Sequence, residues 1–115
     1  MKTQTVYIDK LKKEIEFMIG ENAKDNFSVI DQGSAEDYWF HIQHESSCHV
    51  VAVVPAGLDR KGKGYIIRKG AEICKNHSRF RSMNRVEIVY TKIKNVTKTD
   101  VPGQVNIVDT KIIVV

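Results

Sequence analysis

The sequence predicts an α+β fold, with a mainly antiparallel sheet of about six or seven strands and two helices packed on one face. Three observations predict it. Short alternating or β-branched runs are separated by turns only a few residues long. Two other segments repeat apolar residues every three or four positions, as helices do. The 115 residues fit one domain, and no repeat, low-complexity tract or linker divides them.

The chain is predicted to begin with a hairpin followed by a short helix. Strands over 3–8 and 13–19 flank a turn, and Gly20 ends the second strand. A helix is expected over 21–31. Its apolar residues lie three to four positions apart and define one face: Ala23, Phe27 and Ile30.

The next two strands carry the clearest patterns in the sequence. The segment 37–43 alternates, so one set of side chains points into the core and the other set to a wet or ligand-facing surface. The core set is Tyr38, Phe40 and Ile42, and the opposite set is Trp39, His41 and Gln43. The segment 49–54 is a nearly continuous β-branched run, which is typical of a buried strand.

The second half is predicted to hold a basic loop, a longer helix and three strands. The loop covers 57–64 (GLDRKGKG) and the helix 65–76. Gly70 lies inside this helix at a cost of about 1 kcal/mol relative to alanine, which a close packing contact would explain. The remaining strands are expected over 86–92, 104–108 and 111–115, the last two paired as a hairpin.

Charge is distributed unevenly along the chain. The net charge is +4. Residues 1–58 hold five Lys/Arg and nine Asp/Glu, whereas residues 59–98 hold twelve Lys/Arg and three Asp/Glu. A basic block beside an acidic one is the pattern expected when one surface meets a polyanion.

Other classes of protein are disfavoured. The two cysteines form no CxxC pair, which predicts a reducing compartment and a cytoplasmic protein. The N-terminus lacks the apolar region of a secretory signal, and no apolar stretch approaches the roughly 18 residues of a membrane span. The GKG of the basic loop lacks the rest of the P-loop pattern, so we expect no nucleotide hydrolysis and no cofactor.

One candidate site is centred on the strand that carries the tryptophan. Trp39 and His41 share a strand face, and His49 opens the next strand. An exposed tryptophan beside a histidine would make a stacking platform for a base, with Ser46 and Ser47 offering donors to a phosphate. The alternative is a core tryptophan and a satisfied core histidine, since tryptophan is highly buried on average.

The same segment admits two weaker interpretations. His41, His44, Cys48 and His49 are possible metal ligands, although three-residue spacing puts His41 and His44 on opposite sides of a strand. Asp37, His41 and His49 could also act as acid and base in phosphodiester cleavage. Neither pattern matches a specific motif, so we expect no metal site and no enzyme.

The second candidate site is the basic block. The cations of the loop and helix would contact phosphates and release counterions, while the loop glycines let the backbone follow a phosphate chain. These cations are Arg60, Lys61, Lys63, Arg68, Lys69, Lys75, Arg79, Arg81 and Arg85. Lys92, Lys94 and Lys98 would add a basic ridge.

The motifs together resemble the NFACT-R domain, and most closely its stand-alone form. Its signature is similar to AEDYWFHIQHESSCHVV here, and further segments match upstream and downstream in the same order. The matching positions are Gly20, Asn22, Asn26, Asp37, Trp39, His41, Ser47, His49, Val50, Lys98, Gly103 and Gln104.

The resemblance implies RNA binding, as in ribosome-associated quality-control factors that bring tRNA to large ribosomal subunits. We therefore expect a nucleic-acid-binding domain over 1–115 that binds structured RNA, tRNA or rRNA, with DNA and the ribosome as further partners to test. A protein-interaction module using the KIIVV edge is the remaining alternative. The predicted nucleic-acid-binding residues are Trp39, His41, His49, Arg60, Lys61, Lys63, Arg68, Lys69, Arg79, Arg81, Arg85 and Lys98.

Overall fold

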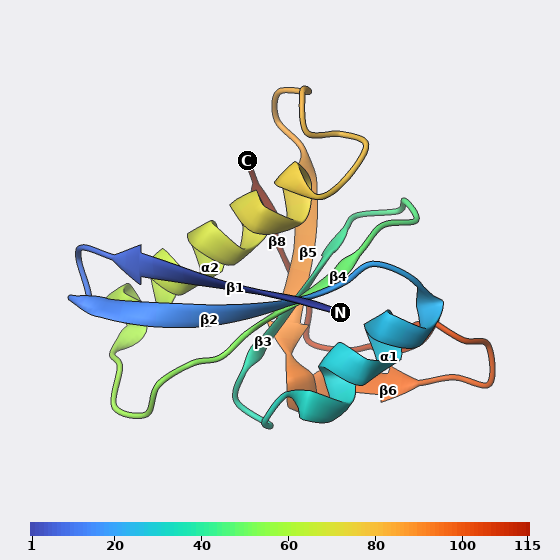
Figure 1. The fold of residues 1–115 in the computed structure, drawn as a ribbon, viewed down its shortest axis with the longest axis horizontal. Coiled ribbons are helices and arrows are strands. Elements are labelled where there is room, and N and C mark those ends of the chain that lie inside the picture. Colours follow the sequence, from blue (N-terminus) through green and yellow to red (C-terminus); the bar gives the residue numbers. More distant parts are fainter.

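The computed structural model describes all 115 residues and contains eight strands, two α-helices and one 3-10 turn (Figure 1). In chain order these are β1 (Lys2–Ile8), β2 (Lys13–Gly20), α1 (Ala23–Gln32), β3 (Tyr38–Ile42), β4 (His49–Ala52), α2 (Arg60–Asn76), β5 (Glu87–Lys92), η1 (Ile93–Asn95), β6 (Val96–Lys98), β7 (Val105–Ile107) and β8 (Lys111–Val114). The predicted hairpin, both helices and the strands near 37–43, 49–54 and 86–92 are all present.

Six strands form one antiparallel sheet in the order β1-β2-β4-β3-β5-β8. Strands β6 and β7 pair with each other in a separate two-stranded sheet. The α+β class and the mainly antiparallel sheet are therefore confirmed. Strand β3 lies between β4 and β5, which places its side chains at the centre of the sheet.

The two helices cover opposite faces of the sheet. Alternate side chains of β3 go to different cores, because successive residues of a strand point to opposite faces. Phe40 packs with Ile66 of α2 on what we call the α2 face, and Trp39 packs with Val29 of α1 on the α1 face. The prediction that both helices share one face is wrong. It failed because the α1-face residues, Trp39 above all, were expected to meet solvent rather than a second core.

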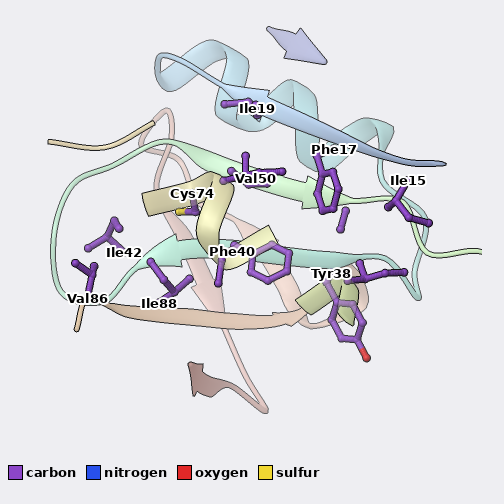
Figure 2. Packing of buried hydrophobic residues seen from close by; sticks show 14 of the residues in the cluster. Ile15, Phe17, Ile19, Tyr38, Phe40, Ile42, Val50, Cys74, Val86 and Ile88 are labelled. Atoms are coloured by element: carbon purple, nitrogen blue, oxygen red, sulfur yellow. The ribbon is translucent and has the colours of Figure 1, made fainter. Parts of the chain in front are cut away.

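The core of the α2 face contains the alternating set predicted from the sequence. Tyr38, Phe40 and Ile42 are all buried there, beside Phe17 and Val50 (Figure 2). Helix α2 adds four buried side chains to this core: Ile66, Ala71, Ile73 and Cys74.

Gly70 is the point of closest approach between α2 and the sheet. A Cβ added at this position would lie 2.4 Å from two ring carbons of Phe40. The close contact expected from the sequence is confirmed, and the missing side chain of Gly70 allows the ring of Phe40 to press against the helix axis.

Helix α2 begins at Arg60, within the segment predicted to be a glycine-rich loop. The side chain of Asp59 caps it by accepting a hydrogen bond from the backbone N–H of Gly62 over 2.7 Å. This N-cap starts the helix despite two glycines in its first five residues, because capping contributes about as much as one glycine costs. Arg60, Lys61 and Lys63 therefore lie on a helix rather than on a flexible loop.

The predicted C-terminal hairpin does not form. β7 pairs with β6, whereas β8 crosses to the edge of the large sheet and pairs with β5. The hydroxyl of Thr91 holds the crossing by donating to the carbonyls of Val108 and Asp109 over 3.0 and 3.2 Å. Strand β6 was missed because a three-residue strand leaves almost no alternation to detect.

Helix α1 also differs in its buried face. Asn22 caps it by accepting a hydrogen bond from the backbone N–H of Asp25. Asn26, Val29 and Ile30 are its buried residues, whereas Ala23 is exposed and Phe27 half-buried. Of the predicted face, Ile30 is buried in the α1-face core and Phe27 packs against it, whereas Ala23 was wrong. A polar residue, Asn26, takes a buried position because its side chain has a backbone partner on β4.

Candidate nucleic-acid interface

A cleft of about 920 Å³ opens where β3 ends and β4 begins. Its lining comes from the N-terminus of α1, the β3–β4 loop, the C-terminus of α2 and the loop that joins β6 to β7. His41, His49 and Trp39 form part of its floor. The structure thus brings together the three residues that the sequence grouped as the tryptophan site.

These three side chains form one contiguous aromatic cluster. The rings of Trp39 and His41 are nearly parallel, with centroids 5.7 Å apart. His49 stands edge-on to both, at 5.2 Å from Trp39 and 5.0 Å from His41. The Nε1–H of Trp39 donates a hydrogen bond to Nδ1 of His49 over 3.2 Å. This bond fixes the neutral tautomer of His49 as the one protonated at Nε2.

Trp39 does not form an exposed stacking platform. Its side chain is only 1% exposed, because it packs against Met18, Val51 and Val89 in the core of the α1 face. The expectation of a solvent-facing indole is corrected by this burial. The alternative raised from the sequence was a core tryptophan and a satisfied core histidine. Trp39 is such a core residue, whereas His41 is only half-buried, with Nδ1 bonded to the carbonyl of Ile42.

His49 is buried and neutral. Burial is the main cause that lowers its pKa to about 3, and the neighbouring His41 lowers it further. Its backbone N–H donates to Oδ1 of Asn26 over 3.0 Å. A side chain 2% exposed with so low a pKa is poorly suited to exchange protons with a substrate near neutral pH.

His41 is the member of the cluster that reaches the cleft. It is half-buried, and burial lowers its pKa. Its Nδ1–H donates to the backbone carbonyl of Ile42 over 2.7 Å, which leaves Nε2 as an acceptor in the neutral ring. His41 can therefore accept a hydrogen bond from a ligand that enters the cleft.

The two serines differ in what they can offer. The hydroxyl of Ser47 accepts from the backbone N–H of Ile42 over 3.1 Å and donates to the carbonyl of Cys48. Ser47 therefore closes the β3–β4 loop. Ser46 is exposed and forms no such bond.

Other residues of the resemblance also have structural roles. The carboxylate of Asp37 accepts backbone N–H bonds from Ser34 and Val54, at 2.8 and 2.9 Å. A Cβ on Gly20 would collide with Asn26, and Gly103 has a φ of +82° that suits glycine. Asp37 thus holds the segments before β3 and after β4, which lie away from the cleft. Gly20 packs against Asn26, and both Asn26 and Gly103 line the cleft.

The structure brings no group of three or more His, Cys, Asp or Glu side chains together in a way that could hold a metal ion. His44 is exposed on the loop. The thiol of Cys48 lies instead near the carbonyl of Cys74 on α2, at 3.8 Å.

No helix is long and apolar enough to cross a membrane.

The cleft itself carries little positive charge. Arg79 is its one arginine, and Nη2 of that side chain lies 2.7 Å from a carboxylate oxygen of Glu45. Glu21 also lines the cleft, and His49 is neutral. The basic residues and the aromatic cluster are therefore largely separate in space.

The predicted cations lie mainly along α2 and the loop that follows it. Arg68 and Lys69 share Glu72 on the helix surface, at 3.8 and 3.2 Å. Arg60, Lys61, Lys63, Arg81 and Arg85 form no ion pair. Lys98 is apart from them: it pairs with Asp31 of α1 over 2.6 Å and lies over the ring of Phe27.

A second hollow, of about 650 Å³, lies between the first turns of α2 and the sheet. We call it the basic groove. Five cations line it: Arg60, Lys63, Lys92, Lys94 and Lys111. In the sequence, Arg60 and Lys63 fall in the predicted basic loop and Lys92 and Lys94 in the predicted basic ridge, and Lys111 belongs to neither group. The register of the strands would have shown that these cations lie together. That register can be assigned only when β5 is known to be the partner of β8.

Comparisons with known proteins agree with this architecture. A family model described as NFACT protein RNA binding domain matches residues 5–109. Coiled-coil domain-containing protein 25 of Danio rerio is 36% identical over 84 residues, which cover 70% of this chain and 40% of that protein. The chain thus spans well under half the length of this curated relative.

A solved structure shares the fold. The C-terminal part of the fibronectin/fibrinogen-binding protein from Streptococcus suis matches with a TM-score of 0.80 at 20% sequence identity. The match covers 100% of this chain and 45% of that chain. At this identity the likeness concerns the fold alone.

Proposed function

The chain belongs to the NFACT RNA-binding domain family, and on that premise we propose that it binds structured RNA, tRNA or rRNA, without catalysing a reaction on it. We place this activity in the cytoplasm, where the ribosome presents both RNAs. Family membership supports RNA binding in general. The choice of a folded RNA rests on the exposed cations of α2 and of the loop that follows it.

The observation that carries the proposal is the set of exposed, unpaired cations on α2 and on the loop that follows it. Arg60, Lys61, Arg81 and Arg85 are exposed and form no ion pair. Arg60 and Lys61 lie on α2 and Arg81 and Arg85 on the loop that follows it. Exposed cations of this kind can replace the counterions of a phosphate backbone. In protein–DNA complexes, half or more of the hydrogen bonds go to phosphate and sugar, and these bonds position the protein on the nucleic acid.

The non-catalytic part of the proposal is supported by the state of the two histidines. A general acid and base need pKa values near the working pH. Burial lowers the pKa of both His41 and His49, that of His49 to about 3. His49 is also held by Trp39, so the pair is better explained as structure than as catalytic machinery.

The test is RNA binding as a function of salt. We expect the affinity for folded tRNA to fall steeply between about 50 and 200 mM salt, with a slope that loses roughly one unit when a phosphate contact is removed. Arg81→Glu should weaken binding. Lys24→Glu is the matched control, because Lys24 is an exposed, unpaired cation on α1. Equal effects of the two variants, or an affinity unaffected by salt, would contradict the proposal.

A second candidate, association with another copy of the chain, is favoured by the free edge of β8. This strand pairs only with β5, and it exposes Ile112 and Val114. An unpaired edge with apolar side chains is a template for strand pairing. Sedimentation would show a dimer that Ile112→Lys dissociates if this candidate is correct.

A further inference from the structure

The basic groove is built by strand register. Tyr38 of β3 is opposite Lys92 of β5, and Tyr90 of β5 is opposite Lys111 of β8. Residues directly opposite each other share a face of the sheet, so all four side chains lie on the α2 face. Helix α2 closes the groove with Arg60 and Lys63 of its first turns. Cations thus converge on one place from the helix, from β5 with its following turn, and from β8.

The positive charge of the groove is only partly neutralised. Glu36 binds two of the lysines, with its oxygens 2.7 Å from Lys92 Nζ and 3.0 Å from Lys94 Nζ. Arg60, Lys63 and Lys111 form no ion pair, and Asp109 is the one carboxylate in the lining. The first turn of α2 also holds no acidic residue, although cations are unfavourable at the positive end of a helix dipole.

An unpartnered hydroxyl faces the same groove. Tyr38 lines the groove, and its hydroxyl forms no hydrogen bond with the protein. That oxygen is open to solvent, because no buried side-chain nitrogen or oxygen lacks a partner. Figure 2 shows this hydroxyl pointing away from the core cluster to which the ring belongs. The hydroxyl is therefore free to donate a hydrogen bond to a ligand that enters the groove. A donor is therefore held beside five cations with no acceptor from the protein.

We propose that the basic groove binds a terminal phosphate, carried either by a free nucleotide or by the end of an RNA strand. A row of cations suits a phosphodiester backbone, which has one charge per phosphate. Cations that converge from three elements around one hydroxyl suit a group with several charges in a small space. The volume of about 650 Å³ is that of a nucleotide-sized site.

The groove is distinct from the cleft of the aromatic cluster. It lies at the first turns of α2, whereas the cleft is lined by His77, Ser78 and Arg79 beyond the last turn. A helix of 17 residues separates them, which is about 25 Å. Only the arm of the proposal that concerns an RNA end rests on the proposed function, because a free nucleotide needs no RNA surface.

The experiment compares ligands that carry phosphate at their end with matched partners that lack it there. Calorimetric titrations with ADP and with adenosine test the free nucleotide. Fluorescence anisotropy with a short RNA, bearing either a 5′-phosphate or a 5′-hydroxyl and labelled at its 3′ end, tests the strand. We expect at least one phosphorylated ligand to bind about tenfold more tightly than its matched partner. Equal affinity within both pairs would overturn the proposal.

Two variants tie the phosphate effect to the groove. Tyr38→Phe removes only a hydroxyl that has no partner in the protein, so the fold should be retained. Lys111→Gln removes one cation. Both should reduce the preference for phosphate several-fold, while Tyr7→Phe and Lys24→Gln, on exposed sites elsewhere, should leave it unchanged. A preference that survives both groove variants would place the phosphate elsewhere and refute the assignment.

The outcome also separates this inference from the proposed function. Binding of ADP without any retention of tRNA would contradict RNA binding and support the groove. Salt-sensitive tRNA binding with no preference for a terminal phosphate would support RNA binding and contradict the phosphate site in the groove.

Discussion

Trp39 and His49, on neighbouring strands, are joined by a hydrogen bond of 3.2 Å between the indole N–H and the imidazole Nδ1, with both side chains buried. The bond gives each ring a partner that water cannot supply at this depth. It links the core of the α1 face to the floor of the cleft. Two of the predictions below follow from it.

Replacement of Trp39 by phenylalanine tests its structural role. The variant keeps an apolar ring but leaves Nδ1 of His49 without a donor, so we expect unfolding to become easier by about 1–3 kcal/mol. Affinity for RNA should be unchanged at temperatures where the protein is folded. Urea denaturation and anisotropy measure the two quantities. A stable variant with greatly weakened RNA binding would restore the stacking role for Trp39.

The buried imidazole predicts how stability depends on pH. The folded pKa of His49 is about 3, below its ordinary value of 6.5, so protonation favours the unfolded chain. The stability that neutral His49 contributes is complete above pH 6.5 and is lost as the pH falls toward 3, with a slope near 1.4 kcal/mol per pH unit. His41 acts in the same direction.

The pH window can be isolated from carboxylate effects. Lys92 and Lys94 lower the pKa of Glu36 to about 2 from its ordinary value of 4.5, so the contribution of that ion pair is lost only below 4.5. Denaturation measured between pH 6.5 and 4.5 should therefore show the histidine slope. In His49→Gln the slope should become shallower, and an unchanged slope would show that other groups cause it.

Two glycines of α2 should respond in opposite ways to alanine. Gly70→Ala places a Cβ against the ring of Phe40, which should destabilise the protein by about 1–3 kcal/mol. Gly64→Ala meets nothing within 4 Å and should stabilise the helix by about 0.5–1 kcal/mol. Thermal or urea unfolding measures both. Phe40→Leu should rescue part of the loss at Gly70, and no rescue would argue against the predicted clash.

The first turn of α2 should depend on its cap. Asp59→Ala leaves the backbone N–H of Gly62 without its partner, and we expect a loss of about 1 kcal/mol. Asp59→Ser keeps an acceptor and should retain most of the stability. Hydrogen exchange at the first turn reports the effect locally. Equal exchange in the wild type and Asp59→Ala would mean that the cap is not what starts the helix.

Much of the fold could be predicted from periodicity, because most elements are long enough to show it. The alternation of 37–43 placed Tyr38, Phe40 and Ile42 in the core, and the helical spacing located α1 and most of α2. Gly70 was correctly read as a packing contact. The family was also recognisable from the motif around Trp39 and His41, and the family match confirms it.

The errors at Trp39 and at 111–115 share one physical cause, which is that the local pattern of a strand does not show which elements lie opposite it. Trp39 was expected to face solvent because nothing in its own strand reveals α1 above it. The strand at 111–115 was predicted to pair with the strand before it in the sequence. In the structure it pairs with β5 instead. The basic groove could not be predicted for the same reason, since Lys111 reaches it only through that register.

Because both faces of the sheet are covered by helices, any shift in the register of β3 would place its side chains in the wrong core. Deleting one residue from this strand would turn the indole toward α2 and the phenylalanine ring toward α1, so that each pocket would receive a side chain of the wrong size. Natural variation in length should therefore be tolerated in the connecting loops and absent from β3, even where individual side chains there can change.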